Sequence, residues 1–161
     1  MELNIQLMDY DKAREISIWT YKDPYSMYNM DGSDECIKEF LSGYYFSVSN
    51  KEKKLIGYYC FGKFAQVPIG NQFGAYDSKE FTDIGLGMKP SLCGKGMGID
   101  FFRKGLEFAR NELSIEKFRL TVADFNERAI KVYEKLGFKK VDYFERVSDL
   151  GKIKFWIMIL C

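Results

Sequence analysis

Glycines at every second position come directly before an expected helix in the window SLCGKGMG. Gly94, Gly96 and Gly98 carry no side chain, so several backbone N–H groups can point at one anion beside the positive end of the helix dipole. Such a turn suits a diphosphate, although similar turns also bind dinucleotides or simply relieve crowding. The glycine order differs from the GxGxxG of dinucleotide-binding turns, and the Gly-Lys-Ser/Thr of a Walker loop is missing.

The strand expected before this turn contains two further glycines, Gly85 and Gly87. Glycine destabilises the interior of a strand unless a bulge or a close backbone approach requires it. Two interpretations follow. Either a ligand lies against this strand, or the glycines only allow tight packing.

The other groups available for chemistry are carboxylates, tyrosines, cysteines, lysines and backbone amides, because the chain contains no histidine. His-based triads, His-ligated zinc and His general bases are therefore excluded. The cysteines stand far apart, without a CxxC pair or metal-ligand spacing, which favours reduced thiols and no metal site. They are Cys36, Cys60, Cys93 and Cys161.

The elements that must position these groups follow from the spacing of apolar residues. Alternation predicts strands at 2–7, 44–50, 55–63, 81–88, 117–123, 138–147 and 152–160. Helical spacing predicts helices from Asp9 to about Thr20, after Ser33 to about Leu41, after the glycine turn through Leu113, and from Asn126 to Gly137. In the last of these, the expected inner face consists of Ala129, Val132, Tyr133 and Leu136. Residues 64–80 are expected to form a surface loop.

The composition is that of one globular α/β domain over residues 1–161, with 47% hydrophobic and 29% charged residues and no break along the chain. A net charge of +1 provides no global field that would attract nucleic acid or an anionic membrane. The sequence contains no run of about 18 apolar residues and no N-terminal apolar block, so we expect a cytoplasmic protein without a membrane span.

Two windows resemble the motifs of the GCN5-related N-acetyltransferase (GNAT) family. DIGLGMKPSLCGKGMGIDFFRKGLEFA is similar to its acetyl-CoA-binding motif, Arg/Gln-x-x-Gly-x-Gly/Ala, and NERAIKVYEKLGF to the following motif, Asn-x-x-Ala-x-x-x-Tyr-x-x-x-Gly-Phe. Both occur in the family's order and at its usual separation. The resemblance implies a mixed, centrally splayed sheet of about seven strands flanked by about four helices. Cys93 stands where Arg or Gln is usual, which would remove one contact to the diphosphate.

The resemblance also implies how acetyl-CoA would be held. The pantetheine arm would bond main-chain groups like an added strand, and the Met88 N–H would donate to the thioester oxygen. Lys95 would add a mobile positive charge, and Asn126 matches a position that contacts the cofactor. The implied cofactor-binding residues are Leu86, Gly87, Met88, Gly94, Lys95, Gly96, Met97, Gly98, Ile99 and Asn126.

For catalysis, Tyr133 matches the family's general acid, a phenol that protonates the departing thiolate. Asp83 lies where some relatives carry a general base, and a chain of water molecules is the alternative. Direct transfer is the family's norm, which argues against Cys93 as a nucleophile.

The acceptor segment, residues 19–31, is rich in aromatic residues beside Asp31, which suits an amine through cation–π attraction. We expect Tyr25 and Tyr28 to bind an amine of a small molecule or peptide. A loop packed on itself, or a contact in a homodimer, is the alternative. For the whole chain, the alternatives are a catalytically silent acetyl-CoA-binding or sensor domain and an interaction module.

Overall fold

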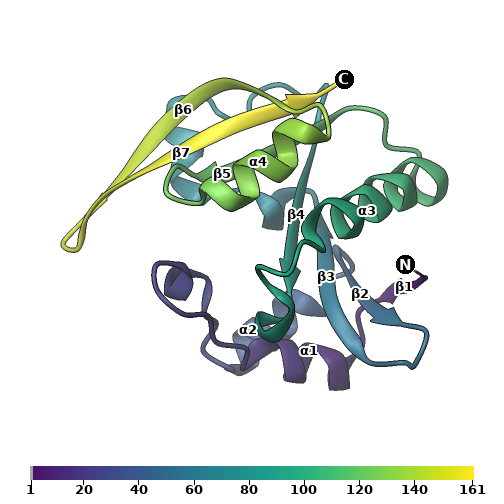
Figure 1. Ribbon diagram of the computed structural model, residues 1–161. Coiled ribbons are helices and arrows are strands. Elements are labelled where there is room, and N and C mark those ends of the chain that lie inside the picture. The colour runs from purple at the N-terminus through teal and green to yellow at the C-terminus, as the bar shows by residue number, and fades with distance from the viewer. Residues whose placement is uncertain (1) are drawn as a thin grey trace. The chain divides into compact units, whose positions relative to one another are not determined.

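The computed structural model describes residues 2–161, and its seven strands form one mixed sheet in the order β1-β2-β3-β4-β5-β7-β6 (Figure 1). The strands are β1 (Leu3–Leu7), β2 (Tyr45–Asn50), β3 (Leu55–Phe61), β4 (Thr82–Met88), β5 (Phe118–Ala123), β6 (Lys139–Ser148) and β7 (Gly151–Leu160). The α-helices of this range are α1 (Tyr10–Ser17), α2 (Asp34–Phe40), α3 (Gly98–Leu113) and α4 (Glu127–Lys135). The predicted mixed α/β class, with about seven strands and four helices, is confirmed.

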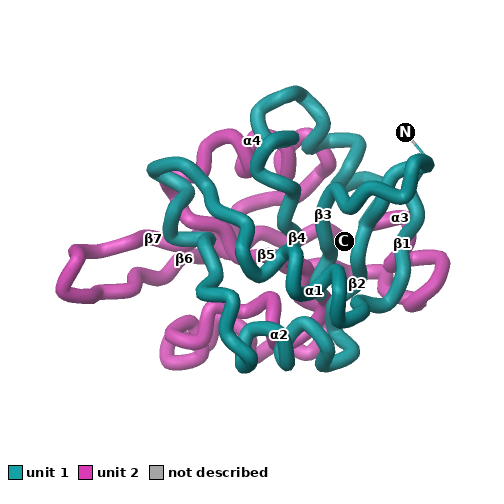
Figure 2. Tube along the Cα trace, turned by 90° about the horizontal axis from the view of Figure 1, so that it is seen from below, with its two compact units in different colours: residues 1–60, 86–105 teal, residues 61–85, 106–161 magenta. Residues whose placement is uncertain are grey.

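The chain forms two compact units, which Figure 2 shows in different colours. The first unit comprises the described residues up to Cys60 together with Leu86–Gly105. The second comprises Phe61–Gly85 and Leu106–Cys161. The boundaries pass through β4 and α3, so each of these elements contributes to both units. The expectation that residues 1–161 form one domain remains a prediction.

In the first unit, β1, β2 and β3 pair antiparallel, which confirms the predicted hairpin. Asp9 caps α1 by accepting the N–H of Lys12 at 2.9 Å. This helix ends at Ser17 rather than near Thr20. The N–H groups of Ile18 and Trp19 bond carbonyls three residues back, so the last turn tightens and the α-helical ladder stops.

The core of the first unit joins β3 to the start of α3. The rings of Tyr59 and Phe101 are fully buried with centroids 4.9 Å apart, and the Tyr59 hydroxyl donates to the Phe101 carbonyl at 2.6 Å. Gly105 allows this approach, because a Cβ there would lie 2.6 Å from the Tyr59 ring. The start of α3 is therefore fixed against β3.

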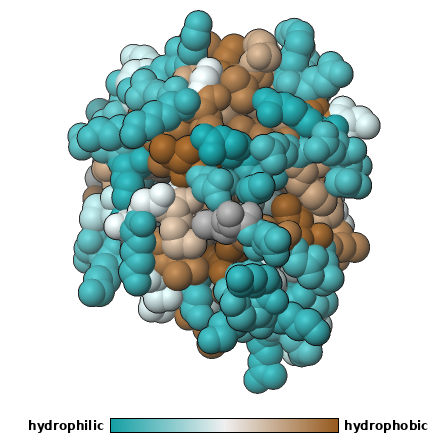
Figure 3. Space-filling model, turned by 45° about the vertical axis from the view of Figure 1, so that its right-hand side comes forward, coloured by the Kyte–Doolittle hydropathy of each residue, from teal (hydrophilic) through white to brown (hydrophobic). Residues whose placement is uncertain are grey.

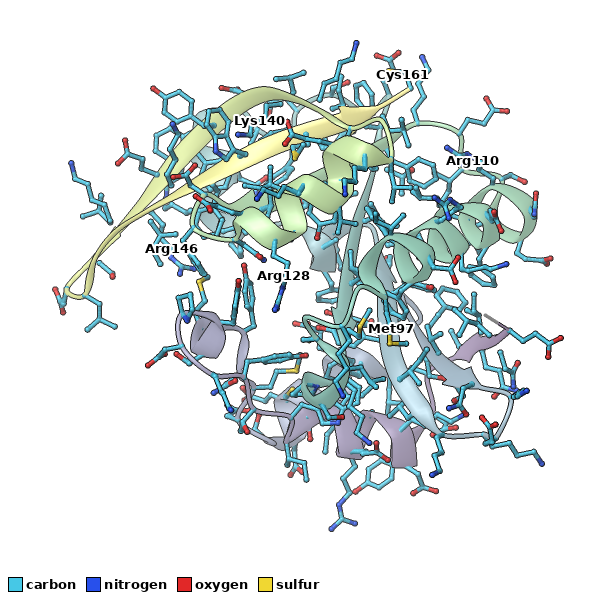
Figure 4. The ribbon with its side chains drawn as sticks, viewed as in Figure 1. Met97, Arg110, Arg128, Lys140, Arg146 and Cys161 are labelled. Atoms are coloured by element: carbon cyan, nitrogen blue, oxygen red, sulfur yellow. The ribbon has the colours of Figure 1, made fainter. Side chains whose placement is uncertain are left out.

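In the second unit, β4 begins parallel to β5 at Thr82 and Asp83, and β7 lies antiparallel between β5 and β6. In the hairpin of β6 and β7, positively charged side chains lie over aromatic rings. The Lys140 ammonium lies 4.4 Å from the Trp156 ring centroid, and the Arg146 guanidinium lies 5.2 Å from that of Phe155 (Figure 4). Such contacts stabilise an edge hairpin by about 0.5–1 kcal/mol each.

Helix α4 begins and ends as its sequence predicts. The Asn126 side chain accepts the Ala129 N–H, and Gly137, at φ +100°, closes a complete Schellman motif. In that motif, Phe138 N–H bonds the Tyr133 carbonyl at 3.0 Å. The four residues of the expected inner face are half-buried, and Ile130 beside them is buried. The other residues of the helix are exposed, so the predicted face is the one turned towards the protein.

Residues 64–80 form a surface loop, as predicted: most of them are exposed or half-buried, and no α-helix or strand lies among them. They contain one 3-10 segment and the end of another, at Pro68–Phe73 and Lys63–Ala65. Tyr76 is 3% exposed, and its hydroxyl accepts the Val67 N–H at 2.9 Å and lies 2.7 Å from Thr121 Oγ1. Through this buried aromatic residue the loop is anchored to the rest of the second unit.

Hydrophilic side chains cover much of the face drawn in Figure 3, with smaller hydrophobic areas between them. Within residues 2–161, no helix is long and apolar enough to cross a membrane.

Candidate active site

The end of β4 has a defined orientation within the first unit. The Lys89 N–H donates to the Ile56 carbonyl of β3 at 2.8 Å. Because a trans peptide directs its N–H and C=O to opposite sides, the Met88 carbonyl points away from β3. In an extended strand the N–H and C=O of one residue face the same side, so the Met88 N–H points away from β3 as well.

Packing within the first unit requires a glycine at position 87. A Cβ on Gly87 would lie 2.2 Å from the ring of Tyr58, and the Gly87 carbonyl lies against Gly57 of β3. Gly57 is needed for the same reason, because its own Cβ would come within 2.5 Å of that oxygen. Tight packing therefore accounts for the missing side chain at Gly87, and a ligand along the main chain of this strand stays a prediction.

The Met88 carbonyl accepts a hydrogen bond from the acceptor segment. The Tyr21 hydroxyl donates to it at 2.8 Å, and the Cys93 thiol lies 3.6 Å from it. Cys93 also lies 3.6 Å from the Lys89 carbonyl, so its thiol is directed back towards the end of β4. Burial, and secondarily the neighbouring Cys93, raise the pKa of Tyr21, so this phenol remains a donor through the neutral range.

The glycine turn has the backbone conformation that its sequence predicts. Gly94 and Gly96 have φ of +73° and +78°, where other residues are strained. A Cβ on Gly96 would meet nothing within 4 Å, so its conformation and not crowding requires the glycine. The Phe101 N–H bonds the Met97 carbonyl at the start of α3, which leaves earlier N–H groups of the turn outside the helical ladder (Figure 4).

The acceptor segment is an ordered loop. Tyr25–Tyr28 form a 3-10 turn in which both predicted substrate-binding tyrosines are half-buried. The Tyr21 N–H donates to the Asn29 side chain at 2.6 Å, which closes the loop around that turn. Asp31 is exposed, and hydrogen bonds from Ser33 lower its pKa, so a carboxylate faces solvent at the end of the segment.

Asp83 lies in the second unit in a buried ion pair. Its two carboxylate oxygens each accept a hydrogen bond from Arg119 at 2.8 Å, and Gln66 donates to one of them at 2.9 Å. Asp83 is 3% exposed and Arg119 4%. The hydrogen bond to Asp83 raises the pKa of Arg119, so the guanidinium stays charged. A base must offer an oxygen to the amine, whereas here both oxygens already bind a cation.

Tyr133 and Asn126 lie at opposite ends of α4. The Tyr133 side chain is half-buried with its ring centroid 6.2 Å from that of Phe138. The Asn126 amide oxygen accepts the Ala129 N–H at 3.3 Å. The helix caps therefore fix the backbone of both residues that the second motif singles out.

The sequence did not identify the roles of two residues, Tyr21 and Arg119. Tyr21 is one of several aromatic residues in the acceptor segment, and no spacing distinguishes the one that bonds Met88. Arg119 lies in an apolar strand, where a basic residue between Phe118 and Leu120 indicates a buried partner. Parallel pairing of Asp83 with Arg119 identifies that partner, but only once the strand register is known.

The comparisons with known proteins agree with this architecture. The model of the acetyltransferase (GNAT) family matches residues 10–138. No curated protein matches the sequence. A GNAT-family acetyltransferase structure from Bacillus anthracis is 16% identical with a TM-score of 0.75, covering 99% of this chain and 95% of that one.

Two further solved structures are spermidine acetyltransferases. A chimera of Vibrio cholerae spermidine N-acetyltransferase SpeG with hSSAT is 17% identical, with a TM-score of 0.71 and coverage of 99% and 96%. Vibrio cholerae spermidine/spermine N-acetyltransferase SpeG with manganese ions is 18% identical, with a TM-score of 0.69 and coverage of 99% and 92%. At these identities the likeness concerns the fold alone.

Proposed function

Because the chain belongs to the acetyltransferase (GNAT) family of N-acetyltransferases, we propose that it transfers an acetyl group from acetyl-CoA directly to a primary amine. One observation carries this proposal. The Met88 N–H is directed away from β3, and a glycine turn and the start of α3 follow it within ten residues. A single donor for a developing oxyanion and an anion-binding turn are thus supplied by one continuous stretch of chain.

The residues present suit acetyl-CoA. The positive φ angles of Gly94 and Gly96 expose backbone N–H groups, and the space beside Gly96 is open. We assign the diphosphate to the amides from Gly94 to Ile99, with Lys95 exposed beside them, and the pantetheine arm to the main chain of Leu86–Met88. When bound, acetyl-CoA supplies the activated acetyl group.

The chain's own residues would then handle charge and protons. The Met88 N–H donates to the oxygen that gains negative charge, and removing such a donor slows comparable reactions by about 10²–10³. The Tyr133 hydroxyl donates a proton to the departing sulfur. We assign Asp83 to the ion pair with Arg119, and we propose that water removes the proton from the amine.

The acceptor class is an amine, and its identity is open between a small molecule and a peptide. The half-buried rings of Tyr25 and Tyr28, with the exposed carboxylate of Asp31, support a cationic ligand. Spermidine acetyltransferases among the similar folds support the same class. We also propose a cytoplasmic location, because the four cysteines form no disulfide within residues 2–161.

One observation favours a second candidate, a silent acetyl-CoA sensor. The Cys93 thiol lies against main-chain carbonyls, where the family's usual Arg or Gln would offer a donor to the diphosphate. Weaker cofactor binding without turnover would fit that alternative.

The test measures acetyl-CoA binding by calorimetry and thiol release across a panel of polyamines, amino acids and peptides. We expect binding, and release with at least one amine. Tyr133→Phe should then lower kcat at least tenfold, whereas Tyr10→Phe, an exposed tyrosine on α1, should not change it. Binding without release from any amine would favour the sensor, and no binding would contradict both candidates.

A further inference from the structure

We propose that Tyr21 is a positioning residue of the transfer reaction, which holds the Met88–Lys89 peptide so that the Met88 N–H stays directed at the reacting carbonyl. The inference rests on the proposed function. It adds a residue from the acceptor segment to the machinery at the end of β4.

The peptide between Met88 and Lys89 is held from both sides. The Lys89 N–H bonds the Ile56 carbonyl of β3 at 2.8 Å, and on the opposite side the Met88 carbonyl accepts the Tyr21 hydroxyl at 2.8 Å. The Cys93 thiol also lies 3.6 Å from that carbonyl, and a thiol is a weaker donor than a phenol. Tyr21 is therefore the principal group that fixes this peptide on the side away from β3.

The strand needs such a restraint at this point. Met88 is the last residue of β4, and Pro90 begins a 3-10 segment two residues later, so no regular ladder continues. Because the N–H and C=O of an extended residue face the same side, the Tyr21 hydroxyl lies on the side to which the Met88 N–H points. A rotation of the peptide would move the donor away from the developing charge, and such donors act only when they are preorganised.

The same residue ties the acceptor segment to the strand. Its own N–H bonds the Asn29 side chain at 2.6 Å, and the Tyr25–Tyr28 turn lies between these two residues in the chain. Burial raises the pKa of Tyr21, so the hydroxyl stays protonated at neutral pH. The geometry thus explains why a phenol and not a charged group is used here: it donates to a carbonyl in a half-buried site without introducing a charge.

The test compares Tyr21→Phe with Tyr10→Phe in steady-state kinetics, calorimetry with CoA, and thermal unfolding. The phenylalanine keeps the ring and removes only the hydroxyl. We expect kcat to fall about tenfold in Tyr21→Phe, with the KM for acetyl-CoA and the Kd for CoA changed less than twofold. Tyr10→Phe should leave all values unchanged.

A purely structural role would give a different result, namely a raised KM for the amine and a lowered Tm with kcat preserved. That outcome, or unchanged kinetics, would overturn the inference. Amide hydrogen exchange without ligand provides a readout that does not need turnover. Tyr21→Phe should speed exchange at Lys89 at least fivefold, because the peptide gains freedom, while Tyr10→Phe should not.

Failure of the two proposals can be distinguished. If the wild-type protein releases no thiol with any amine, the proposed function fails, and the exchange rate at Lys89 alone decides whether Tyr21 holds the peptide. If the wild-type protein is active and Tyr21→Phe matches it in kcat, only the role of Tyr21 is wrong.

Discussion

At the scale of single residues, the buried ion pair of Asp83 and Arg119 has a structural role. The bidentate contact satisfies two guanidinium donors, and a third donates to the Ser78 carbonyl at 3.1 Å. Charges that are buried and fully hydrogen-bonded are tolerated as a pair, but either one alone is costly in the interior. The pair therefore acts as one unit that the fold must keep intact.

We expect Asp83→Asn to destabilise the protein by about 3–5 kcal/mol, because it leaves the Arg119 charge without its counterion. Urea unfolding measures this loss, with Asp149→Asn at an exposed position as the control. The double replacement of Asp83 by Leu and Arg119 by Met should recover part of the lost stability. If Asp83→Asn instead keeps its stability and loses thiol release selectively at lower pH, Asp83 is the base after all.

At the scale of elements, sequence reasoning succeeded where one short-range rule decides the outcome. Ser33 and Asn126 cap helices as predicted, and Gly137 ends α4. It provides no information where a distant contact decides. Tyr76 packs 64–80 through Thr121, forty-five residues away, and no local pattern contains that information. The candidate site divides in the same way, since its motifs are local, whereas the bond from Tyr21 to Met88 joins residues 67 apart.

The glycine turn allows a matched test of conformation against binding. Gly96 and Gly43 both have positive φ, +78° and +96°, and a Cβ on either would meet nothing within 4 Å. Alanine at either position should therefore cost a similar stability, about 1–2 kcal/mol from the left-handed conformation. Only Gly96→Ala should also weaken CoA binding, by at least fivefold in calorimetry. Equal CoA affinities in the two variants would show that the turn does not hold the diphosphate.

At the scale of the whole molecule, buried thiol and phenol groups make the free energy of unfolding depend on pH in the alkaline range. Burial raises the pKa of the Cys60 thiol to about 12, and burial also raises that of Tyr58 and Tyr59. In each case the folded state holds the proton more tightly than the unfolded chain. The stabilisation from each group is complete below the pKa that the group has in the unfolded chain, which is near 9 for cysteine. It is lost as the pH rises through the pKa that the group has in the folded protein.

The free energy of unfolding should therefore stay level from pH 7 to about 8.5 and fall steadily between about pH 9 and 12. Urea unfolding at a series of pH values measures this dependence, and Cys60→Ala should reduce the slope near pH 9–10. Cys161, which is exposed, provides the control, because Cys161→Ala should leave the slope unchanged. A flat profile up to pH 12 would show that these groups titrate alike in both states.

The boundaries of the two units have a consequence for synthesis on the ribosome. The chain leaves the first unit after Cys60, returns to it at Leu86 and leaves it again after Gly105. When Cys60 emerges from the ribosome, the stretch that carries Phe101, the ring against which Tyr59 packs, has not yet emerged. Neither unit can therefore fold first and independently of the other. A nascent chain arrested near residue 85 should remain protease-sensitive along its whole length.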